Sequence, residues 1–306
     1  MKKEKNKKVQ QLSKYNHEIF FEPSIDYVFK KVFGTEENKD ILKGLLCSVL
    51  GMTSEDVEDI AIVNGELPKQ NRKDKLSRLD ILLRLNNQKM INIEMQMFNY
   101  KTLPKRILYY WSQVYISTSQ AGIDYDGLDP CITIWFLNQT MFKQADKAHT
   151  IFTIREKDLD IQFTDVFEAH IVELTKTENN NKKLDEWIKF LNLKNKEEME
   201  MLKDNTTNTD VKEAIDIVKL MTLDEKSRYE YINRTMEIKD YYTLKDEAMR
   251  EGIEEGKQEG IEIGKQEGIE EGKKDVAKKL LKSGVDIEII KSTTGLEDEE
   301  IQKLKE

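Results

Sequence analysis

The amino-acid sequence predicts a mixed α/β fold with the element order αβββαβ, followed by a helical C-terminal extension. Two segments with alternating apolar residues, 78–85 and 89–98, lie on either side of a polar break and indicate a β-hairpin. Apolar residues at helical spacing precede this hairpin in residues 37–51 and follow it in residues 101–122. Beyond residue 176 the strand patterns end and helical patterns continue. A sheet with helices before and after its hairpin is therefore expected.

The remaining elements follow from local signals along the chain. Gly51 is a stop signal for the first helix, while Pro104 and Gly122 stand in the first turn and at the end of the second. The centre of residues 57–67 is strand-like, and the later predicted strands are residues 131–138, 149–156 and 168–174. Further helices are predicted over LDEWIKFLNL, VKEAIDIVKLM and the charged stretch that ends at Arg250.

The hairpin carries one carboxylate on each strand. With a three-residue loop at 86–88, Leu85 pairs with Lys89, and counting back from that pair brings Asp80 opposite Glu94. Both carboxylates then lie on the face opposite the isoleucines, which we expect to be the face away from the core. A slip of one residue would send Asp80 to the other side, so the register decides whether the two carboxylates meet.

Two facing carboxylates suit a hard divalent cation. Opposed Cβ atoms on neighbouring strands lie about 4.5–5.5 Å apart, and Mg²⁺ takes one or two carboxylates together with carbonyl and water oxygens. We therefore expect Asp80, Glu94 and the backbone carbonyl of Met95 to be metal ligands. Gln96 lies on the same strand face as Glu94 and is a candidate catalytic side chain. The alternative is a surface hairpin whose polar side chains simply face water.

Five sequence blocks occur in a fixed order along the chain: SIDYVFKKVFGTEENKDILKGLLCSVLG (24–51), RLDILL (78–83), INIEMQ (91–96), LPKRILYYWSQVY (103–115) and EAHIVELTK (168–176). In this order they resemble the PD-(D/E)XK nuclease superfamily and, within it, the Rpn family of recombination-promoting nucleases and transposases. The resemblance covers about residues 20–235. It implies a restriction-endonuclease-like αβββαβ core and a metal-dependent nuclease that acts on DNA.

The resemblance also implies roles for particular residues. Asp80 and Glu94 correspond to the metal-binding acids of the superfamily, and a further catalytic acid from the N-terminal helical region would be Asp26 or Glu37. Gln96 stands where the broad superfamily has lysine. A glutamine orients water by hydrogen bonding but carries no charge to neutralise the scissile phosphate, so that charge must come from elsewhere. Rpn-type chains carry this Glu-x-Gln version, which is therefore expected to be a working variant.

Basic residues cluster around the hairpin. From Gly65 to Tyr110 the sequence has ten Lys and Arg against four Asp and Glu, a local charge of +6 in a chain whose formal net charge is -9. We expect this segment to contact DNA phosphates. The candidate contacts are Arg78, Lys75, Lys105 and Arg106. The alternatives are a solvated loop over residues 69–78 and a core role for the aromatic stripe beside Arg106.

Composition limits the class of protein. The 306 residues allow one sizeable domain with an appendage, and a hydrophobic content of 38% supports a core. No apolar run approaches the length needed to span a membrane, and the basic start lacks the apolar segment of a secretory signal, so no membrane partner is expected. Cys47 and Cys131 are predicted to be buried thiols, which favours a reducing cytoplasm, and the resemblance implies a bacterial cytoplasm or nucleoid.

The C-terminal part of the chain contains a repeat. From Gly252 to Gly272, six glycines recur every four residues. Each would destabilise a helix by about 1 kcal/mol relative to alanine, so a helix is improbable here without compensation. We nevertheless favour a helical spacer that self-associates or flexes over plain disorder, because Glu, Lys, Gln and Ile surround the glycines.

The last residues predict three short helices separated by Ser283-Gly284 and Thr294-Gly295. This spacing is similar to that of a helix-turn-helix. The second turn is followed by the acidic residues 297–300, which phosphates would repel, and this favours a packing or dimerisation cap over a sequence reader.

These observations divide the chain into a nuclease-like domain over residues 18–235, a helical linker with the glycine repeat over 236–274 and a helical cap over 275–306. The expected function is that of a Mg²⁺-dependent DNA endonuclease in recombination or mobile-element processing, which forms a homo-oligomer through its C-terminal helical region. The alternative is a catalytically degenerate nuclease fold that serves as an oligomeric, DNA-associated interaction module. Retained metal binding distinguishes the two.

Overall fold

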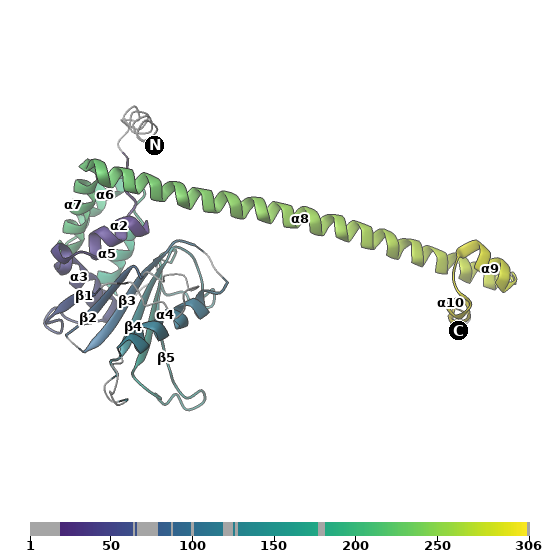
Figure 1. Cartoon of the computed structure of the whole chain (residues 1–306), viewed down its shortest axis with the longest axis horizontal. Coiled ribbons are helices and arrows are strands. Elements are labelled where there is room, and N and C mark those ends of the chain that lie inside the picture. Colours follow the sequence, from purple (N-terminus) through teal and green to yellow (C-terminus); the bar gives the residue numbers. More distant parts are fainter. Residues whose placement is uncertain are drawn as a thin grey trace. The chain divides into compact units, whose positions relative to one another are not determined.

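The computed structural model of the chain describes residues 19–63, 65, 79–86, 88–98, 101–118, 125, 128–176 and 181–304. The chain divides into two compact units, Met1–Thr235 and Met236–Glu306, which are described separately here. The first unit contains the sheet (Figure 1).

The described strands of the first unit form one mixed sheet of six strands in the order β1-β2-β3-β4-β6-β5. The strands β1, β2 and β3 are antiparallel neighbours, β4 and β6 continue the sheet in parallel with β3, and β5 is antiparallel to β6. Their bounds are β1 (Ile60–Val63), β2 (Ile81–Leu85), β3 (Lys89–Gln96), β4 (Cys131–Leu137), β5 (His149–Thr153) and β6 (Phe167–Glu173). With the helices before β1 and after β3, this confirms the predicted αβββαβ order.

The register of the β2–β3 hairpin is the predicted one. Leu85 pairs with Lys89, and the pairs continue to Ile81 opposite Ile93. Asn86, the first loop residue, has a φ of 50°, a left-handed conformation that asparagine tolerates better than most residues. Its side chain accepts hydrogen bonds from the backbone N–H groups of Glu58 and Asp59, so the loop is tied to the start of β1. Asn87 lies outside the described residues.

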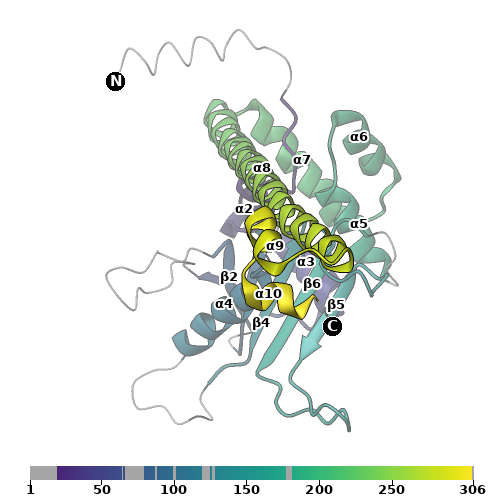
Figure 2. The same ribbon diagram turned by 90° about the vertical axis from the view of Figure 1, so that its right-hand side faces the viewer.

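Both faces of the sheet are covered, which corrects the expectation that the carboxylate face points away from the core. Seven consecutive residues of β3, from Met90 to Gln96, are buried. Helix α2 (Asp26–Phe33) covers one face, where the ring centroids of Phe29 and Phe136 lie 5.7 Å apart. Helix α4 (Leu103–Ser117) covers the other face and packs on a cluster that includes Trp135 (Figure 2). The polar and the apolar residues that alternate along β3 are therefore both buried, one set on each face of the sheet.

The helices that frame the hairpin begin and end close to the predicted places. After a 3₁₀ turn, η1 (Glu36–Asn38), helix α3 (Lys39–Leu50) ends at Gly51, whose φ of 69° is accessible to glycine without strain. Pro104 lies in the first turn of α4, where its missing N–H is not needed. Helix α4 ends at Ser117, before the predicted stop at Gly122, which lies outside the described residues.

Three helices follow β6, and each is preceded by an asparagine whose side chain accepts backbone N–H bonds of the first turn. They are α5 (Lys182–Leu191), α6 (Lys196–Asn205) and α7 (Thr209–Leu223), with the caps Asn181, Asn195 and Asn208. Helices α5 and α7 contact α3, and α7 also contacts α2. This helical layer holds α2 against its face of the sheet.

Helix α8 (Glu225–Lys282) is the longest element, and its first turns belong to the first unit. There Tyr231 is 5% exposed and stacks on Phe21, with ring centroids 4.2 Å apart. The Tyr231 hydroxyl accepts a hydrogen bond of 3.2 Å from the backbone N–H of Glu22. The start of α8 is therefore fixed to the segment that leads into α2.

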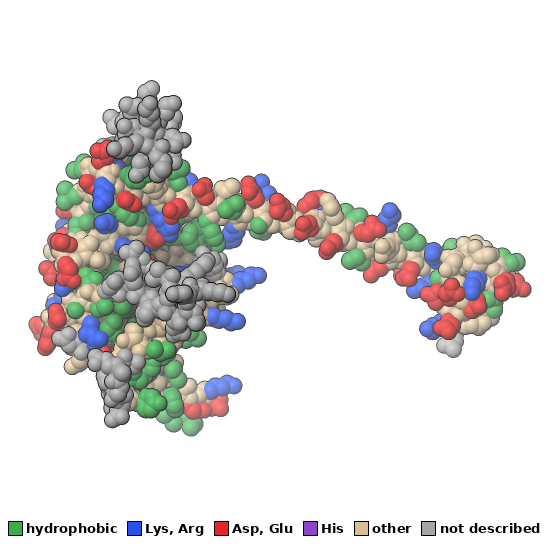
Figure 3. All heavy atoms as spheres, in the orientation of Figure 1, with side chains coloured by type: hydrophobic (Ala, Val, Ile, Leu, Met, Phe, Trp, Pro, Cys, Tyr) green, Lys and Arg blue, Asp and Glu red, His purple; other side chains and the backbone are tan. Residues whose placement is uncertain are grey.

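The glycine repeat lies in the interior of α8 as continuous helix, in spite of the expected cost. A Cβ atom placed on any of the six repeat glycines would meet no neighbour within 4 Å, so close packing does not require glycine there. Acidic and basic side chains are interspersed along the visible face of this helix (Figure 3). Among the described residues, we find no helix that combines the length and the apolar character needed to cross a bilayer.

The second unit ends in two short helices, α9 (Ile287–Thr294) and α10 (Asp298–Lys303). They enclose a small core with the last turns of α8, made of Ala277, Ile290, Leu296 and Ile301. Gly284 and Gly295, at the two predicted breaks, both have positive φ values, 74° and 68°. This confirms the two glycine turns and the last two of the three predicted short helices, while the first is the end of α8 and not a separate helix.

Replacing Gly256 and Gly264 by alanine is expected to stabilise α8 locally, because both positions are helical and have room for a Cβ atom. The gain should be about 1 kcal/mol per site, so amides of residues 252–268 should exchange with deuterium roughly fivefold more slowly per substitution where local opening limits exchange. Gly51→Ala is the matched control, since its left-handed backbone should make that change destabilising. Faster exchange in the Gly256→Ala variant would contradict this account of the repeat.

Candidate active site

Asp80 stands directly before β2 and is held against the end of β3 by two hydrogen bonds. The backbone N–H of Met95 donates to Oδ2 of Asp80 at 2.8 Å. In the other direction, the backbone N–H of Asp80 donates to Oε1 of Glu94 at 3.2 Å. Each carboxylate is thus anchored on the strand that carries the other, and the two acids meet as the predicted register requires.

Glu94 lies on the sheet face covered by α4 and is 4% exposed. Burial and the neighbouring Asp80 carboxylate raise the pKa of Glu94 to about 8. The backbone N–H of Asp80 and the cationic side chains of Arg106 and Lys30 oppose this rise. Negative charge at this position is therefore costly unless a further positive charge is nearby.

The carboxylate of Asp80 has a direct cationic partner that sequence analysis did not select. Lys30 of α2 places its Nζ 2.8 Å from Oδ1 of Asp80. Burial raises the pKa of Asp80, and the ion pair and hydrogen bond with Lys30 act against that rise. The carboxylate of Asp80 is therefore bonded on one oxygen to Lys30 and on the other to Met95.

Gln96 is 5% exposed, and both ends of its amide are engaged. Its Nε2 donates to the backbone carbonyl of Phe98 at 2.8 Å, and its Oε1 accepts from Nη1 of Arg106 at 2.9 Å. The guanidinium of Arg106 lies over the rings of Tyr110 and Trp135, 4.9 and 5.7 Å from their centroids. The amide of Gln96 is thereby fixed in orientation beside Glu94.

The structure does not gather Asp26 into a three-carboxylate group with Asp80 and Glu94. Asp26 begins α2, is 18% exposed at its side chain and pairs with Nε of Arg234 on α8 at 2.7 Å. Its charge contributes to the raised pKa of Asp80. Glu37, the other candidate acid, is exposed on the 3₁₀ turn. Among the described residues, no group of three or more His, Cys, Asp and Glu side chains is placed to hold a metal ion.

The predicted DNA contacts divide into three groups. Arg78 and Lys75 lie outside the described residues. Lys105 is exposed on α4. Arg106 is half-buried and bonded to Gln96, so its first role in this structure is to hold a side chain of the site.

The donor set fits a hard divalent cation. Two carboxylates with little solvent exposure lie together. Each accepts a backbone hydrogen bond from the segment that carries the other, and Lys30 contacts the remaining oxygen of Asp80. The N–H of Met95 points toward Asp80, and the C=O of a strand residue points to the same edge as its N–H, so this carbonyl suits the role of a third protein ligand. Mg²⁺ needs no more than one or two carboxylates when waters and phosphate oxygens complete its shell.

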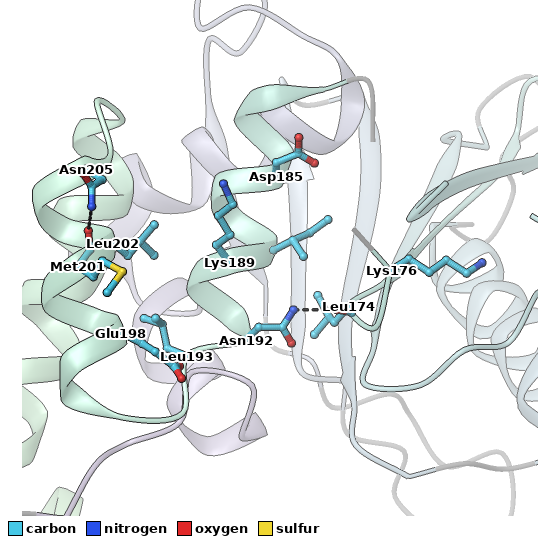
Figure 4. Close-up of a pocket in the computed structure, with 11 residues that line it drawn as sticks. Leu174, Lys176, Asp185, Lys189, Asn192, Leu193, Glu198, Met201, Leu202 and Asn205 are labelled. Carbon is cyan, nitrogen blue, oxygen red and sulfur yellow. Dashed lines mark hydrogen bonds between the residues drawn. The ribbon is translucent and has the colours of Figure 1, made fainter. Parts of the chain in front are cut away.

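A pocket elsewhere in the first unit lacks this chemistry. A pocket of about 540 Å³ lies between α5, α6 and the segment after β6, and Figure 4 shows the side chains that line it. Its lining includes Leu174, Ile188 and Met201, with Lys189 and Glu198 among the charged side chains, and neither Asp80 nor Glu94 belongs to it.

The cysteines are both reduced. Cys131 is buried as predicted, and burial raises the pKa of its thiol to about 12, which makes a nucleophilic role unfavourable. Cys47 is half-buried, which corrects the expectation of full burial.

Comparison with protein families decides the assignment. A family model described as PD-(D/E)XK nuclease family transposase matches residues 23–248. The chain belongs to this family. A second model, the C-terminal helix-turn-helix domain of the Rpn/YhgA-like nuclease family, matches residues 270–306. Searches among curated proteins and solved structures found no significant match.

These matches confirm the family resemblance and the fold class, and they assign a nuclease of transposase-like type in general terms. They correct the preference for a packing cap at the C-terminus, because residues 270–306 match a helix-turn-helix domain. The acidic residues 297–300, which favoured the packing cap, form contacts within the second unit. Glu297 and Glu300 form a capping box at α10, and Lys291 pairs with Glu297 at 3.0 Å.

Two residues of the site were missed by sequence analysis. Lys30 lies four residues after Asp26, so the two share one face of α2, and the choice of Asp26 could have pointed to Lys30. Arg234 offers no comparable signal. It lies 208 residues from Asp26 along the chain, in a charged helix with many similar residues.

In the absence of metal, the protein is expected to become less stable as pH rises from about 5 to 8. Native Glu94 keeps its proton up to about pH 8, whereas the unfolded chain releases it near the ordinary value of 4.5. The native state therefore holds the extra proton within this window, and the free energy of unfolding falls as pH rises through it. Thermal unfolding in EDTA at several pH values measures the trend. Glu94→Gln should flatten it, and an equally steep fall in that variant would contradict the assignment.

Proposed function

We propose that this nuclease-family chain is a divalent-metal-dependent endonuclease that hydrolyses DNA phosphodiester bonds, with Mg²⁺ as the expected cation. The observation that carries the proposal is the pairing of Asp80 and Glu94 across adjacent strands, with the backbone of Met95 bonded to Asp80. Both pKa values are raised, so the negative charge of the two acids destabilises the native fold. A divalent cation bound between them would offset that charge.

When bound, a divalent cation supplies Lewis-acid catalysis, since it stabilises charge on phosphate oxygens and makes water a stronger nucleophile near neutral pH. Asp80, Glu94 and the carbonyl of Met95 would hold it. Gln96 keeps a second N–H and a second acceptor lone pair beyond the bonds to Phe98 and Arg106, and these suit it to orient the attacking water. Arg106 fixes that orientation.

The proposed setting is DNA recombination or the processing of mobile elements. The family match to transposases and the C-terminal helix-turn-helix match support DNA as the partner. Lys105, exposed on α4 close to Arg106, remains a candidate phosphate contact, and the same holds for Arg78 and Lys75 from the sequence. These assignments rest on charge and position.

A second candidate is a catalytically degenerate member that acts as a DNA-associated interaction module. Gln96 in place of a charged side chain is the observation that favours it, because the site then lacks one cation on the strand. Such a protein would bind DNA through its C-terminal domain and would leave DNA uncut in the presence of any divalent cation.

Asp80→Asn and Glu94→Gln are each expected to lower the rate of plasmid nicking by more than about 100-fold, because each removes a charged ligand while keeping the shape of the side chain. The measurement is conversion of supercoiled plasmid to the open circle with Mg²⁺ or Mn²⁺. The control is Asp59→Asn, an exposed carboxylate at the start of β1.

The three variants should show the same affinity for uncut DNA in EDTA, so that a loss of nicking reports on chemistry. Nicking at the wild-type rate by both Asp80→Asn and Glu94→Gln would show that another pair of residues carries the reaction. An intact chain that binds DNA but cuts none would select the degenerate alternative.

The expected homo-oligomer through the C-terminal region gives a further prediction. Ile253, Ile261 and Ile269 recur every eight residues along the repeat and are each more than half exposed, so a second copy of α8 could cover them. A chain that ends at Glu247 retains Tyr231 and Arg234 and should therefore remain folded but have a lower oligomeric state. Light scattering of both chains measures this, and equal oligomer numbers would remove the proposed association.

A further inference from the structure

We propose that Lys30 of α2 is a catalytic residue of this site and supplies the positive charge that Gln96 cannot supply from strand β3. The proposal rests on the proposed nuclease function and names the group that replaces the missing lysine. The ammonium of Lys30 would donate a hydrogen bond to a nonbridging oxygen of the scissile phosphate next to Asp80 and would transfer no proton.

The position of Lys30 relative to the two acids supports this role. Its Nζ lies 2.8 Å from Oδ1 of Asp80, and its charge also acts on Glu94. The side chain of Lys30 is 36% exposed, whereas that of Asp80 is 10% exposed. The ammonium of Lys30 is therefore more accessible to solvent, and to a phosphodiester, than the carboxylate that it contacts. An ammonium has three N–H donors, and the ion pair with Asp80 uses one of them.

Two neighbouring residues direct Lys30 toward Asp80. Asp26 lies one helical turn before Lys30 on the same face of α2 and would otherwise compete for its ammonium. Nε of Arg234 occupies Oδ1 of Asp26 at 2.7 Å. Asp26 and Arg234 are therefore positioning residues for Lys30, which gives a role to the acid that sequence analysis took for a catalytic one.

Arg106 is a second cation near Glu94 among the described residues, and its contacts suit it less well to this role. Its Nη1 donates to Gln96, and its guanidinium is stacked over Tyr110 and Trp135. Lys30, in contrast, forms an ion pair directly with Asp80, a proposed metal ligand. A lysine is also a compact point charge on a flexible stem, so it can follow a phosphate oxygen with little rearrangement of the fold.

The reaction balances without a change in the protonation of Lys30. The oxygen of water forms a bond to phosphorus, and the bond from phosphorus to the leaving oxygen breaks with its electron pair. The water gives up a proton to solvent, and the leaving oxygen takes one from solvent, so one water is consumed for each bond cut. Lys30 offsets the charge that gathers on the phosphate oxygens in the transition state.

The test uses the full chain with Lys30→Met and Lys30→Gln, and Lys31→Met as the control. Lys31 is the next residue of α2 and is exposed. Both Lys30 variants are expected to lower the rate of plasmid nicking by about 100-fold or more, while Lys31→Met should keep the wild-type rate. Affinity for Mn²⁺, measured by calorimetry without DNA, should be unchanged or higher in the Lys30 variants, because the ammonium no longer competes for Asp80.

The double variant Lys30→Met/Gln96→Lys tests whether an ammonium on strand β3 can replace that of Lys30. It returns the ammonium to strand β3, and nicking should recover at least about tenfold relative to Lys30→Met. Thermal unfolding checks that each variant is folded. Nicking at the wild-type rate by the Lys30 variants would overturn the proposal. A second contradicting result is that the Lys30 variants lose nicking, bind Mn²⁺ more weakly and show no recovery in the double variant. If the wild-type chain cuts no DNA while it still binds Mn²⁺, the proposed function fails first and the role of Lys30 fails with it.

Discussion

The reciprocal hydrogen bonds between the start of β2 and the end of β3 are the interaction on which the site depends. The N–H of Met95 holds Asp80, and the N–H of Asp80 holds Glu94, so the backbone brings together two carboxylates that repel each other. Burial under α4 increases that repulsion and raises both pKa values. The rest of the first unit supplies compensation from one face, where Lys30 reaches Asp80 from α2, and from the other, where Arg106 acts on Glu94 from α4.

The hairpin could be predicted from sequence because its determinants are local. A short loop with asparagine in a left-handed conformation fixes the Leu85–Lys89 pair, and the period of the strand then fixes every later pair. Burial of the carboxylate face was not predicted correctly, since alternating polar residues are typical of a solvated face. Only the tertiary structure shows that Asn92, Glu94 and Gln96 are buried, and that Gln96 accepts a hydrogen bond from Arg106 of α4.

The contacts that complete the site join residues far apart in the chain. Lys30 and Asp80 are separated by fifty positions, and Asp26 and Arg234 by 208. Hydrophobic periodicity places α2 in a helix but does not say which strand end it covers, so the sequence could suggest Asp26 without revealing its partner. The stacking of Tyr231 on Phe21 explains how the second contact forms, because it fixes the start of α8 beside the segment that precedes α2.

The two ends of α8 therefore depend on different sources of stability. Its first turns are held by tertiary contacts, and its last turns by the small core with α9 and α10. Between them the six glycines weaken the helix by several kcal/mol in sum, on the scale of about 1 kcal/mol each.

The acidic side chains at the end of the second unit form contacts within that unit. Glu297 and Glu300 cap α10, and Lys291 neutralises part of their charge, so the acidity of this segment reflects how a six-residue helix is stabilised and does not by itself exclude contact with DNA.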